Sequence, residues 1–194
     1  VERLFGFRDV LPGQLETVAC VLRDEDVLTI LPTGGGKSLC YQLPAFLAES
    51  GLTLVISPLI ALMKDQVDRL QQLGIAATFI NSSLSSQEQS RRLDKMARGD
   101  WKLVYIAPER LRSPAFVSAL KPVQISLLAV DEAHCISDWG HDFRPHYRLL
   151  ERIVRTLPPN LRLLATTATA NDRVMDDLMA VLGPKLDISR GDLN

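Results

Sequence analysis

The chain has 194 residues, of which 46% are hydrophobic and 23% are charged, as in a soluble globular domain with a single core. Its net charge is −1, so no overall positive field indicates a nucleic-acid binder, and such a site would have to concentrate its positive charge locally. The apolar runs fall far short of the ~18–20 residues of a membrane span. The 3 cysteines contain no C-x-x-C pair, which argues against a disulfide framework and a cysteine zinc site.

Apolar runs alternate with helical patterns along the chain. Consecutive apolar residues predict strands at Val27–Leu31, Leu52–Ser57, Ala77–Ile80, Leu103–Ala107, Ile125–Val130 and Leu161–Thr167. Helical spacing and capping signals predict helices at Lys37–Glu49, Leu59–Leu73, Ser85–Gly99, Pro114–Leu120, Pro145–Thr156 and Asn171–Leu182. Buried strands that are each followed by a helix indicate an α/β fold of three layers, with a mostly parallel sheet covered by helices on both faces. No repeat or linker interrupts the pattern, so residues 1–194 are predicted to form one domain.

A glycine-rich segment joins the first predicted strand to the helix after it and reads Pro32-Thr33-Gly34-Gly35-Gly36-Lys37-Ser38. Glycines allow successive backbone N–H groups to turn inward around phosphate oxygens, and the helix N-terminus adds partial positive charge. Lys37 is suited to the β and γ phosphates, and the Ser38 hydroxyl to Mg²⁺. The segment therefore predicts a nucleotide-binding loop from Thr33 to Ser38.

An acidic segment follows a later strand, where Ile125–Val130 runs into Asp131-Glu132-Ala133-His134. In a parallel sheet, this strand delivers its last side chains to the same edge as the glycine-rich loop. Asp131 is then placed to hold Mg²⁺ through its water shell, and Glu132 to orient and deprotonate an attacking water. The pattern predicts a hydrolytic site between the two segments.

Together the glycine-rich loop, the Asp-Glu-Ala-His box and the segment Thr167-Ala168-Thr169 resemble the first motor domain of a superfamily-two helicase. The segment from His134 to Pro145, which contains Trp139, His141, Phe143 and Arg144, is similar to the aromatic-rich loop of the RecQ family of DNA helicases. The resemblance implies a RecA-like P-loop NTPase domain of a DEAH-box DNA helicase, with ATP and Mg²⁺ as cofactors.

The resemblance also implies roles for individual residues at the nucleotide. The family's motif upstream of the phosphate loop resembles the segment from Phe5 to Gln14, with Val10 and Leu11 in place of the family's second Phe and its Arg. It implies that Gln14 bonds the adenine edge, that Phe7 lies against the base and that His141 lies near the nucleotide. Catalysis is assigned to Lys37, Asp131, Glu132 and His134, with His134 linking the acidic box to Thr167 and Thr169.

Three further segments match DNA-contacting parts of the family. The first contains Pro58 and Leu59, the second Pro108 and Arg110, and the third Trp139, Phe143 and Arg144. Exposed aromatic side chains beside an arginine suit single-stranded DNA, because every base offers a face for stacking. Backbone amides at helix N-termini can hold phosphates without raising the net charge.

The family's second RecA-like lobe has no counterpart in this sequence, and the chain begins at Val1. We therefore expect one half of a longer motor that moves 3′ to 5′ on single-stranded DNA and unwinds duplexes, in the cytoplasm of a bacterium or the nucleus of a eukaryote. This half alone should not unwind DNA. Two alternatives remain: an RNA helicase or remodelling ATPase of the same superfamily, and a scaffold that binds nucleotide or DNA without turnover.

Two further patterns have simpler interpretations. The 3 histidines fit no familiar zinc spacing, and we expect no metal cluster among them. Arg144, Arg148, Arg152 and Arg155 recur at helical spacing, so we expect most of them to share one face. They could contact phosphates, although a solvated face is the interpretation we favour for the last three.

Overall fold

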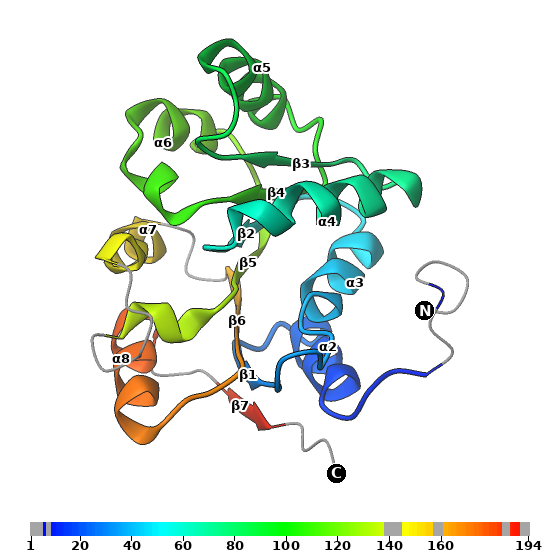
Figure 1. The fold of residues 1–194 in the computed structure, drawn as a ribbon, viewed down its shortest axis with the longest axis vertical. Helices are drawn as coiled ribbons and strands as arrows, with labels where there is room; N and C mark the ends of the chain where they lie inside the picture. The colour runs from blue at the N-terminus through cyan, green and yellow to red at the C-terminus, as the bar shows by residue number, and fades with distance from the viewer. Residues whose placement is uncertain (1–5, 7–8, 138–144, 157–160, 184–186, 191–194) are drawn as a thin grey trace.

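Figure 1 shows the chain as a computed structural model, which describes residues 6, 9–137, 145–156, 161–183 and 187–190. Its centre is a 7-stranded sheet in the order β3-β4-β2-β5-β6-β1-β7. All strand pairs in the described part are parallel. The strands are β1 (Val27–Ile30), β2 (Leu52–Ile56), β3 (Ala77–Ile80), β4 (Leu103–Ile106), β5 (Ile125–Val130), β6 (Arg162–Thr167) and β7 (Asp187–Arg190).

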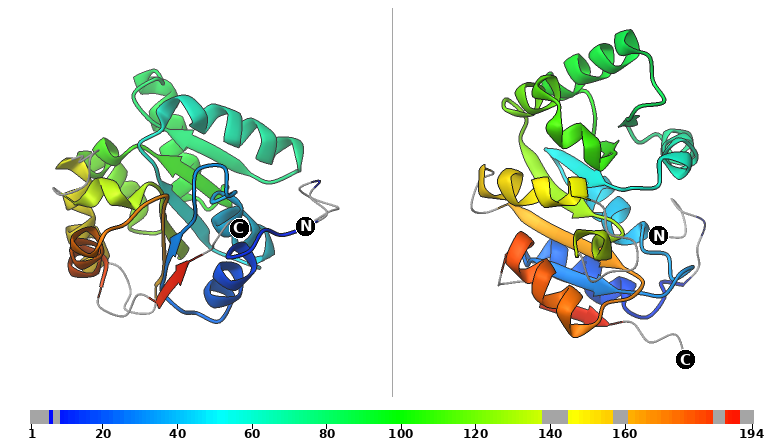
Figure 2. Two further views of the ribbon diagram at one scale, coloured as in Figure 1. Left: turned by 60° about the horizontal axis from the view of Figure 1, so that its bottom comes forward. Right: turned by 60° about the vertical axis from the view of Figure 1, so that its left-hand side comes forward.

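Helices cover both faces of this sheet, as the two views of Figure 2 show. One face is packed by α2 (Gln14–Leu22), α3 (Leu39–Leu47) and α4 (Ile60–Gln72). The other is packed by α5 (Ser86–Ala97), α6 (Pro114–Leu120), α7 (Leu150–Thr156) and α8 (Asp172–Leu182). Three short 3₁₀ helices lie in the connections: η1 (Pro108–Arg112), η2 (Ala133–Ile136) and η3 (Pro145–Leu149).

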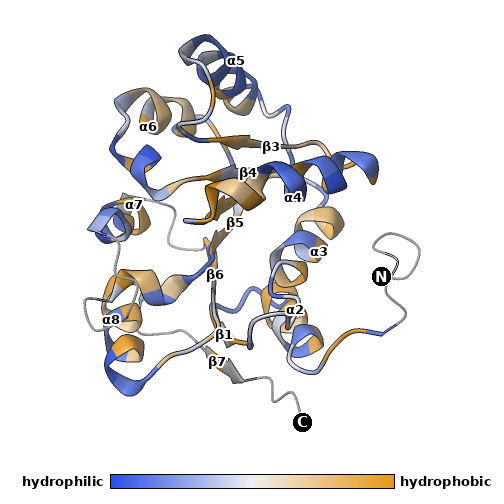
Figure 3. Ribbon diagram, viewed as in Figure 1, coloured by the Kyte–Doolittle hydropathy of each residue, from blue (hydrophilic) through white to orange (hydrophobic). Residues whose placement is uncertain are grey.

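The alternation of side chains along each strand divides the core into two apolar clusters. On β5, Leu128 and Val130 belong to the cluster under α5 to α8, and Leu127 and Ala129 to the cluster under α2 to α4. Because successive strand residues point to opposite faces, a strand with both faces covered must be apolar throughout. Figure 3 shows hydrophobic colour along the central strands and a mixture of hydrophilic and hydrophobic colour along helices such as α4 and α5. None of the described helices is long and apolar enough to cross a bilayer.

The structure confirms the predicted fold class and the six predicted strands, whose ends differ by no more than about one residue. The Ser85 hydroxyl accepts from the Glu88 amide and caps α5, as the capping signal indicates. The segment Pro145–Thr156 is helical, as predicted, but its first five residues wind as the 3₁₀ helix η3 and only the rest forms the α-helix α7. The 3₁₀ winding of η3 accompanies burial of the Tyr147 side chain in the core.

Two elements have weak sequence signals and were not predicted. Helix α2 begins after Gly13, whose amide donates to the Glu16 carboxylate at 2.8 Å. Strand β7 is a four-residue edge strand that pairs with β1. Tertiary contacts position both elements, since α2 packs on α3 and β1, and β7 packs along β1.

The central strand β5 offers a test of the two-sided core. Leu128 is completely buried, and its truncation in Leu128→Ala should lower the free energy of unfolding by about 2–5 kcal/mol. The matched change Leu22→Ala, at a leucine that is 47% exposed, should cost well under half as much. Chemical denaturation of both variants measures the difference, and equal losses would contradict this assignment of the core.

Candidate active site

The site lies at the carboxyl edge of the sheet, where four neighbouring strands end. The phosphate loop follows β1, Ser57 follows β2, Asp131 follows β5, and Thr167 ends β6. The order β2-β5-β6-β1 brings these ends side by side, although the segments are far apart in the sequence. A cavity of about 340 Å³ opens at this edge. Its walls are the phosphate loop, the acidic pair, the start of α4 and two tyrosines: Thr33, Gly34, Gly36, Lys37, Ser38, Tyr41, Ser57, Leu59, Leu62, Met63, Gln66, Tyr105, Asp131 and Glu132.

The phosphate loop folds as a tight turn between β1 and α3. The Gly35 amide donates to the Pro32 carbonyl at 2.9 Å, and Gly34 and Gly36 have φ of 83° and 67°. Such left-handed backbone favours glycine. Among the described residues, no protein acceptor is found for the amides of Gly34, Gly36, Lys37 and Ser38. A run of unpaired amides at a helix N-terminus can bind the oxygens of a phosphate.

Gln14 is buried against the phosphate loop. Its side-chain nitrogen donates to the carbonyls of Gly35, at 3.2 Å, and Gly36, at 3.0 Å, and its oxygen accepts from the Leu11 amide at 2.8 Å. A Cβ at Gly36 would lie 2.2 Å from that nitrogen, so the contact requires glycine there. In this structure Gln14 therefore braces the loop, and its bond to adenine stays a prediction.

Asp131 lies at the end of β5 in a partly buried network of hydroxyl donors. Its Oδ1 accepts from the Thr166 hydroxyl at 2.9 Å and the Glu132 amide at 3.0 Å, and its Oδ2 lies 3.4 Å from the Ser57 hydroxyl. Desolvation by burial raises the pKa of Asp131, against the lowering effect of the Thr166 hydrogen bond. A cation beside the buried Asp131 carboxylate would offset this desolvation and favour its charged form.

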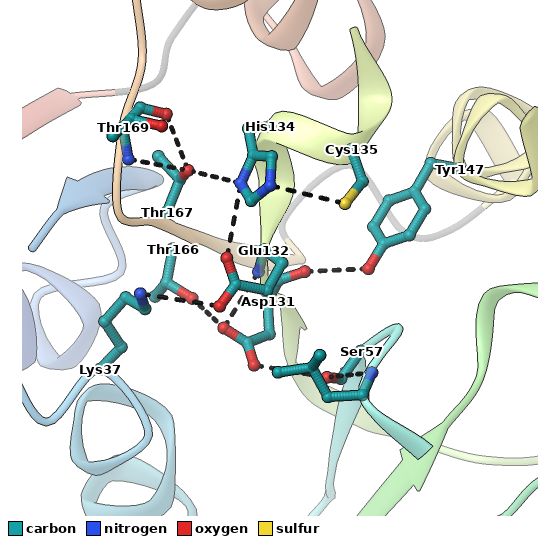
Figure 4. Close-up of polar contacts among 11 residues, drawn as sticks. Lys37, Ser57, Asp131, Glu132, His134, Cys135, Tyr147, Thr166, Thr167 and Thr169 are labelled. Carbon is teal, nitrogen blue, oxygen red and sulfur yellow. Dashed lines mark hydrogen bonds and ion pairs between the residues drawn. The ribbon is translucent and has the colours of Figure 1, made fainter. Parts of the chain in front are cut away.

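Glu132 turns back toward the phosphate loop because its backbone is left-handed. Its φ and ψ are 49° and 47°, a conformation that few residues other than glycine adopt. The carboxylate lies 3.7 Å from Lys37 Nζ and 3.4 Å from His134 Nδ1. Figure 4 shows the Lys37 and Glu132 side chains facing each other. Lys37, predicted to bind a phosphate, and Glu132, predicted to activate water, thus lie beside each other.

His134 connects the acidic box to β6 through hydrogen bonds. Its Nδ1 lies 3.0 Å from the Thr167 hydroxyl, and that hydroxyl donates to the Thr169 carbonyl at 2.9 Å (Figure 4). Since the Thr167 proton is used in that bond, the bond to His134 requires the proton on Nδ1. The structure thus brings His134, Thr167 and Thr169 together, while their role in coupling stays a prediction.

The predicted DNA-contacting residues in the described part lie on the same edge of the sheet. Pro58 and Leu59 precede α4, and Pro108 and Arg110 belong to η1 after β4. Leu59 is 38% exposed, whereas Pro108 is buried. The Arg110 guanidinium donates to Gln89 on α5 at 2.6 Å, and its Nε has no partner within the described structure.

Five predicted site residues lie outside the described residues: Phe7, Trp139, His141, Phe143 and Arg144. Conversely, three side chains that the sequence did not single out contact the acidic box, namely Ser57, Thr166 and Tyr147. Their positions at strand ends or beyond a loop gave no local signal. No group of three or more His, Cys, Asp or Glu that could hold a metal ion occurs among the described residues.

The parallel sheet, the phosphate loop after β1 and the acidic segment after β5 define the chain as a RecA-like P-loop α/β domain. A family model described as DEAD/DEAH box helicase matches residues 11–178. The chain belongs to this family.

Its curated relatives include RecQ helicases. The ATP-dependent DNA helicase RecQ of Bacillus subtilis is 50% identical over 175 residues, which are 90% of this chain and 29% of that protein. RecQ of Haemophilus influenzae is 44% identical over 185 residues, 95% of this chain and 30% of the relative. The ATP-dependent DNA helicase Q1 of Rattus norvegicus is 45% identical and is covered to 30%. The chain thus spans under a third of the length of these relatives.

Solved helicase structures share the fold. A hypothetical ATP-dependent RNA helicase from Sulfolobus tokodaii superposes with a TM-score of 0.75 at 17% identity, over 97% of this chain and 54% of that one. The helicase domain of Pyrococcus furiosus Hef gives 0.71 at 19% identity, over 93% of this chain and 38% of that one. Likeness at this identity concerns the fold alone.

The raised pKa of Asp131 gives a stability test. A carboxyl that binds its proton more readily folded than unfolded weakens folding above its folded pKa, and the penalty is relieved as pH falls through that pKa. We expect Asp131→Asn, without nucleotide or divalent cations, to have a higher Tm than the native chain at pH 7. This difference should shrink on acidification. Asp176→Asn, at an exposed position on α8, should leave Tm nearly unchanged. A lower Tm for Asp131→Asn than for the native chain at pH 7 would contradict the view that the buried Asp131 carboxylate weakens folding.

Proposed function

We propose that the chain binds Mg-ATP and hydrolyses it as the first motor lobe of a RecQ-type DNA helicase. The observation that carries this proposal is the convergence at one cavity of the unpaired loop amides, Lys37 and the carboxylates of Asp131 and Glu132. Phosphoryl transfer depends on such positioning and charge stabilisation more than on covalent chemistry. The names of the RecQ relatives, each called an ATP-dependent DNA helicase, support the same activity.

The loop and Lys37 perform the binding step. The backbone amides of Gly34, Gly36, Lys37 and Ser38 donate to phosphate oxygens, and Lys37 exchanges its ion pair with Glu132 for the β and γ phosphates. The Ser38 hydroxyl and the Asp131 carboxylate, both at the cavity, would hold Mg²⁺, Asp131 through the water shell of the ion, since hard oxygen groups suit it. When bound, this ion would offset the charge that develops on the transferred phosphoryl group.

Release of Lys37 frees Glu132 for proton transfer. The Glu132 carboxylate accepts a proton from the attacking water as the water oxygen bonds the γ-phosphorus and ADP leaves. His134, whose Nδ1 lies 3.4 Å from that carboxylate, lies close enough to stabilise its charged form before the transfer. Because His134 also bonds Thr167, a change at the phosphates can reach the segment that leaves β6. We assign coupling to this chain of bonds.

The activity of the whole motor needs more than this chain. We propose that it belongs to a longer protein whose second RecA-like lobe completes the site, as the partial coverage of its relatives suggests. That protein would move 3′ to 5′ on single-stranded DNA and unwind duplexes. The exposed Leu59 and the Arg110 of η1 would contact the strand, and a DNA-bound structure of the similarly folded helicase MrfA supports this use of the fold. An RNA helicase remains the second candidate, since one fold neighbour carries that name.

Glu132 is tested by Glu132→Gln, which keeps the shape and removes the base. We expect nucleotide to bind at least as tightly, because Lys37 loses its competing charge, while hydrolysis falls by about 10²–10⁴-fold. Binding of a fluorescent ATP analogue to this chain and phosphate release by the full-length protein measure the two effects. Glu49→Gln, at an exposed site, is the matched control. Undiminished hydrolysis by Glu132→Gln would refute the proposed base.

Arg110 is tested by the salt dependence of DNA binding. Arg110→Ala should weaken binding of single-stranded DNA and reduce the slope of log affinity against log salt by about one, as expected for a single phosphate contact. Arg98→Ala removes an exposed arginine paired with Asp100 and should leave the slope unchanged. Identical slopes of log affinity against log salt in both variants would show that Arg110 does not contact the DNA. The same titration with RNA of equal length distinguishes the DNA motor from the RNA helicase.

A further inference from the structure

Tyr147 reaches the acidic box from the opposite face of the sheet to Lys37. It lies on η3 with its side chain completely buried in the apolar cluster under α5 to α8. Its hydroxyl donates to the backbone carbonyl of Asp131 at 3.0 Å. Figure 4 shows the phenol ring pointing at this carbonyl from the side away from the phosphate loop.

This bond completes the fixation of one peptide group. The carbonyl of the Asp131–Glu132 peptide accepts from Tyr147, and its amide donates to Asp131 Oδ1 at 3.0 Å. On the next peptide, the Glu132 carbonyl accepts from the Cys135 amide at 2.9 Å. The peptide is therefore held on both sides, and rotation about its flanking bonds would break at least one hydrogen bond.

The fixed peptide determines where the Glu132 carboxylate points. Glu132 has φ of 49°, a left-handed conformation that costs energy for a residue with a Cβ and persists only where its surroundings enforce it. A relaxed backbone would swing the carboxylate away from Lys37 Nζ, now 3.7 Å distant, and from His134 Nδ1. The surroundings that enforce the conformation include the Tyr147 hydroxyl.

We propose that Tyr147 is a positioning residue for Glu132: its hydroxyl holds the Asp131–Glu132 peptide so that the Glu132 carboxylate faces the phosphates and the attacking water. The inference rests on the proposed role of Glu132 as the base. It assigns a function to the phenol hydroxyl rather than to the ring, which fills core space in any case. Tyr147→Phe therefore separates the two, since it keeps the ring and removes the hydroxyl that bonds the Asp131 carbonyl.

The first measurement follows the Glu132 backbone in this chain by NMR. Tyr147→Phe should move the amide resonances of Glu132 and Cys135 and speed their hydrogen exchange by at least about tenfold relative to the amides of β4. The control Ser85→Ala removes a cap of α5, which also costs stability but lies away from the acidic box. It should leave the two amides unchanged. An unperturbed Glu132 in Tyr147→Phe would overturn the inference, whatever the hydrolysis rate.

The second measurement is hydrolysis by the full-length protein. Tyr147→Phe should lower kcat by about tenfold or more while changing KM for ATP by less than about twofold, because misplacing a base affects the chemical step and leaves the phosphate contacts in place. In a Glu132→Gln background, Tyr147→Phe should cause no further loss. An undiminished kcat, or a full additional loss in that background, would overturn the inference. Undiminished hydrolysis by Glu132→Gln alone would instead refute the proposed role of Glu132 in hydrolysis, so the two failures are distinguishable.

Discussion

The site depends on the parallel alignment of four neighbouring strands. Because β2, β5, β6 and β1 run in one direction, their carboxyl ends meet at one edge, and every segment that leaves them begins there. The phosphate loop and the acidic box, distant in sequence, are thereby placed on two strands separated only by β6. Both faces of the sheet must be covered for this arrangement to exist, so the apolar strands and the two clusters of helices are conditions of the site as much as of the fold.

Around the acidic box, the requirements of folding and of chemistry oppose each other. Burial raises the pKa of Asp131, and Glu132 is held in a left-handed conformation. Each arrangement weakens the folded state and leaves a group ready to interact with a cation or a water. The surrounding core tolerates them because hydroxyl groups from Ser57, Thr166 and Tyr147 satisfy the polar atoms of the segment from both faces of the sheet.

Hydrogen bonds also connect the acidic box to its neighbours. His134 and Thr167 tie it to β6, and Tyr147 ties it to η3, the element that follows the predicted DNA-contacting segment with Trp139 and Phe143. The predicted DNA contacts Leu59 and Arg110 lie in the segments that follow β2 and β4, the next strands along the same edge. In the function we propose, a near-neutral domain contacts a phosphate backbone here through local amides and single arginines in place of a general positive charge.

The sequence alone determined the fold class, six strands and the identity of the phosphate loop and acidic box, because these depend on local signals: unbroken apolar runs, glycines and charged residues at strand ends. It predicted that Lys37 and Glu132 serve one site, and their side chains lie 3.7 Å apart. It did not predict α2, β7, the 3₁₀ winding of η3, the brace from Gln14 to the phosphate loop, or the contacts of Thr166 and Tyr147. These were decided by tertiary structure, since a hydroxyl on a strand or a buried tyrosine has the same local pattern whether it only fills the core or bonds a distant carbonyl.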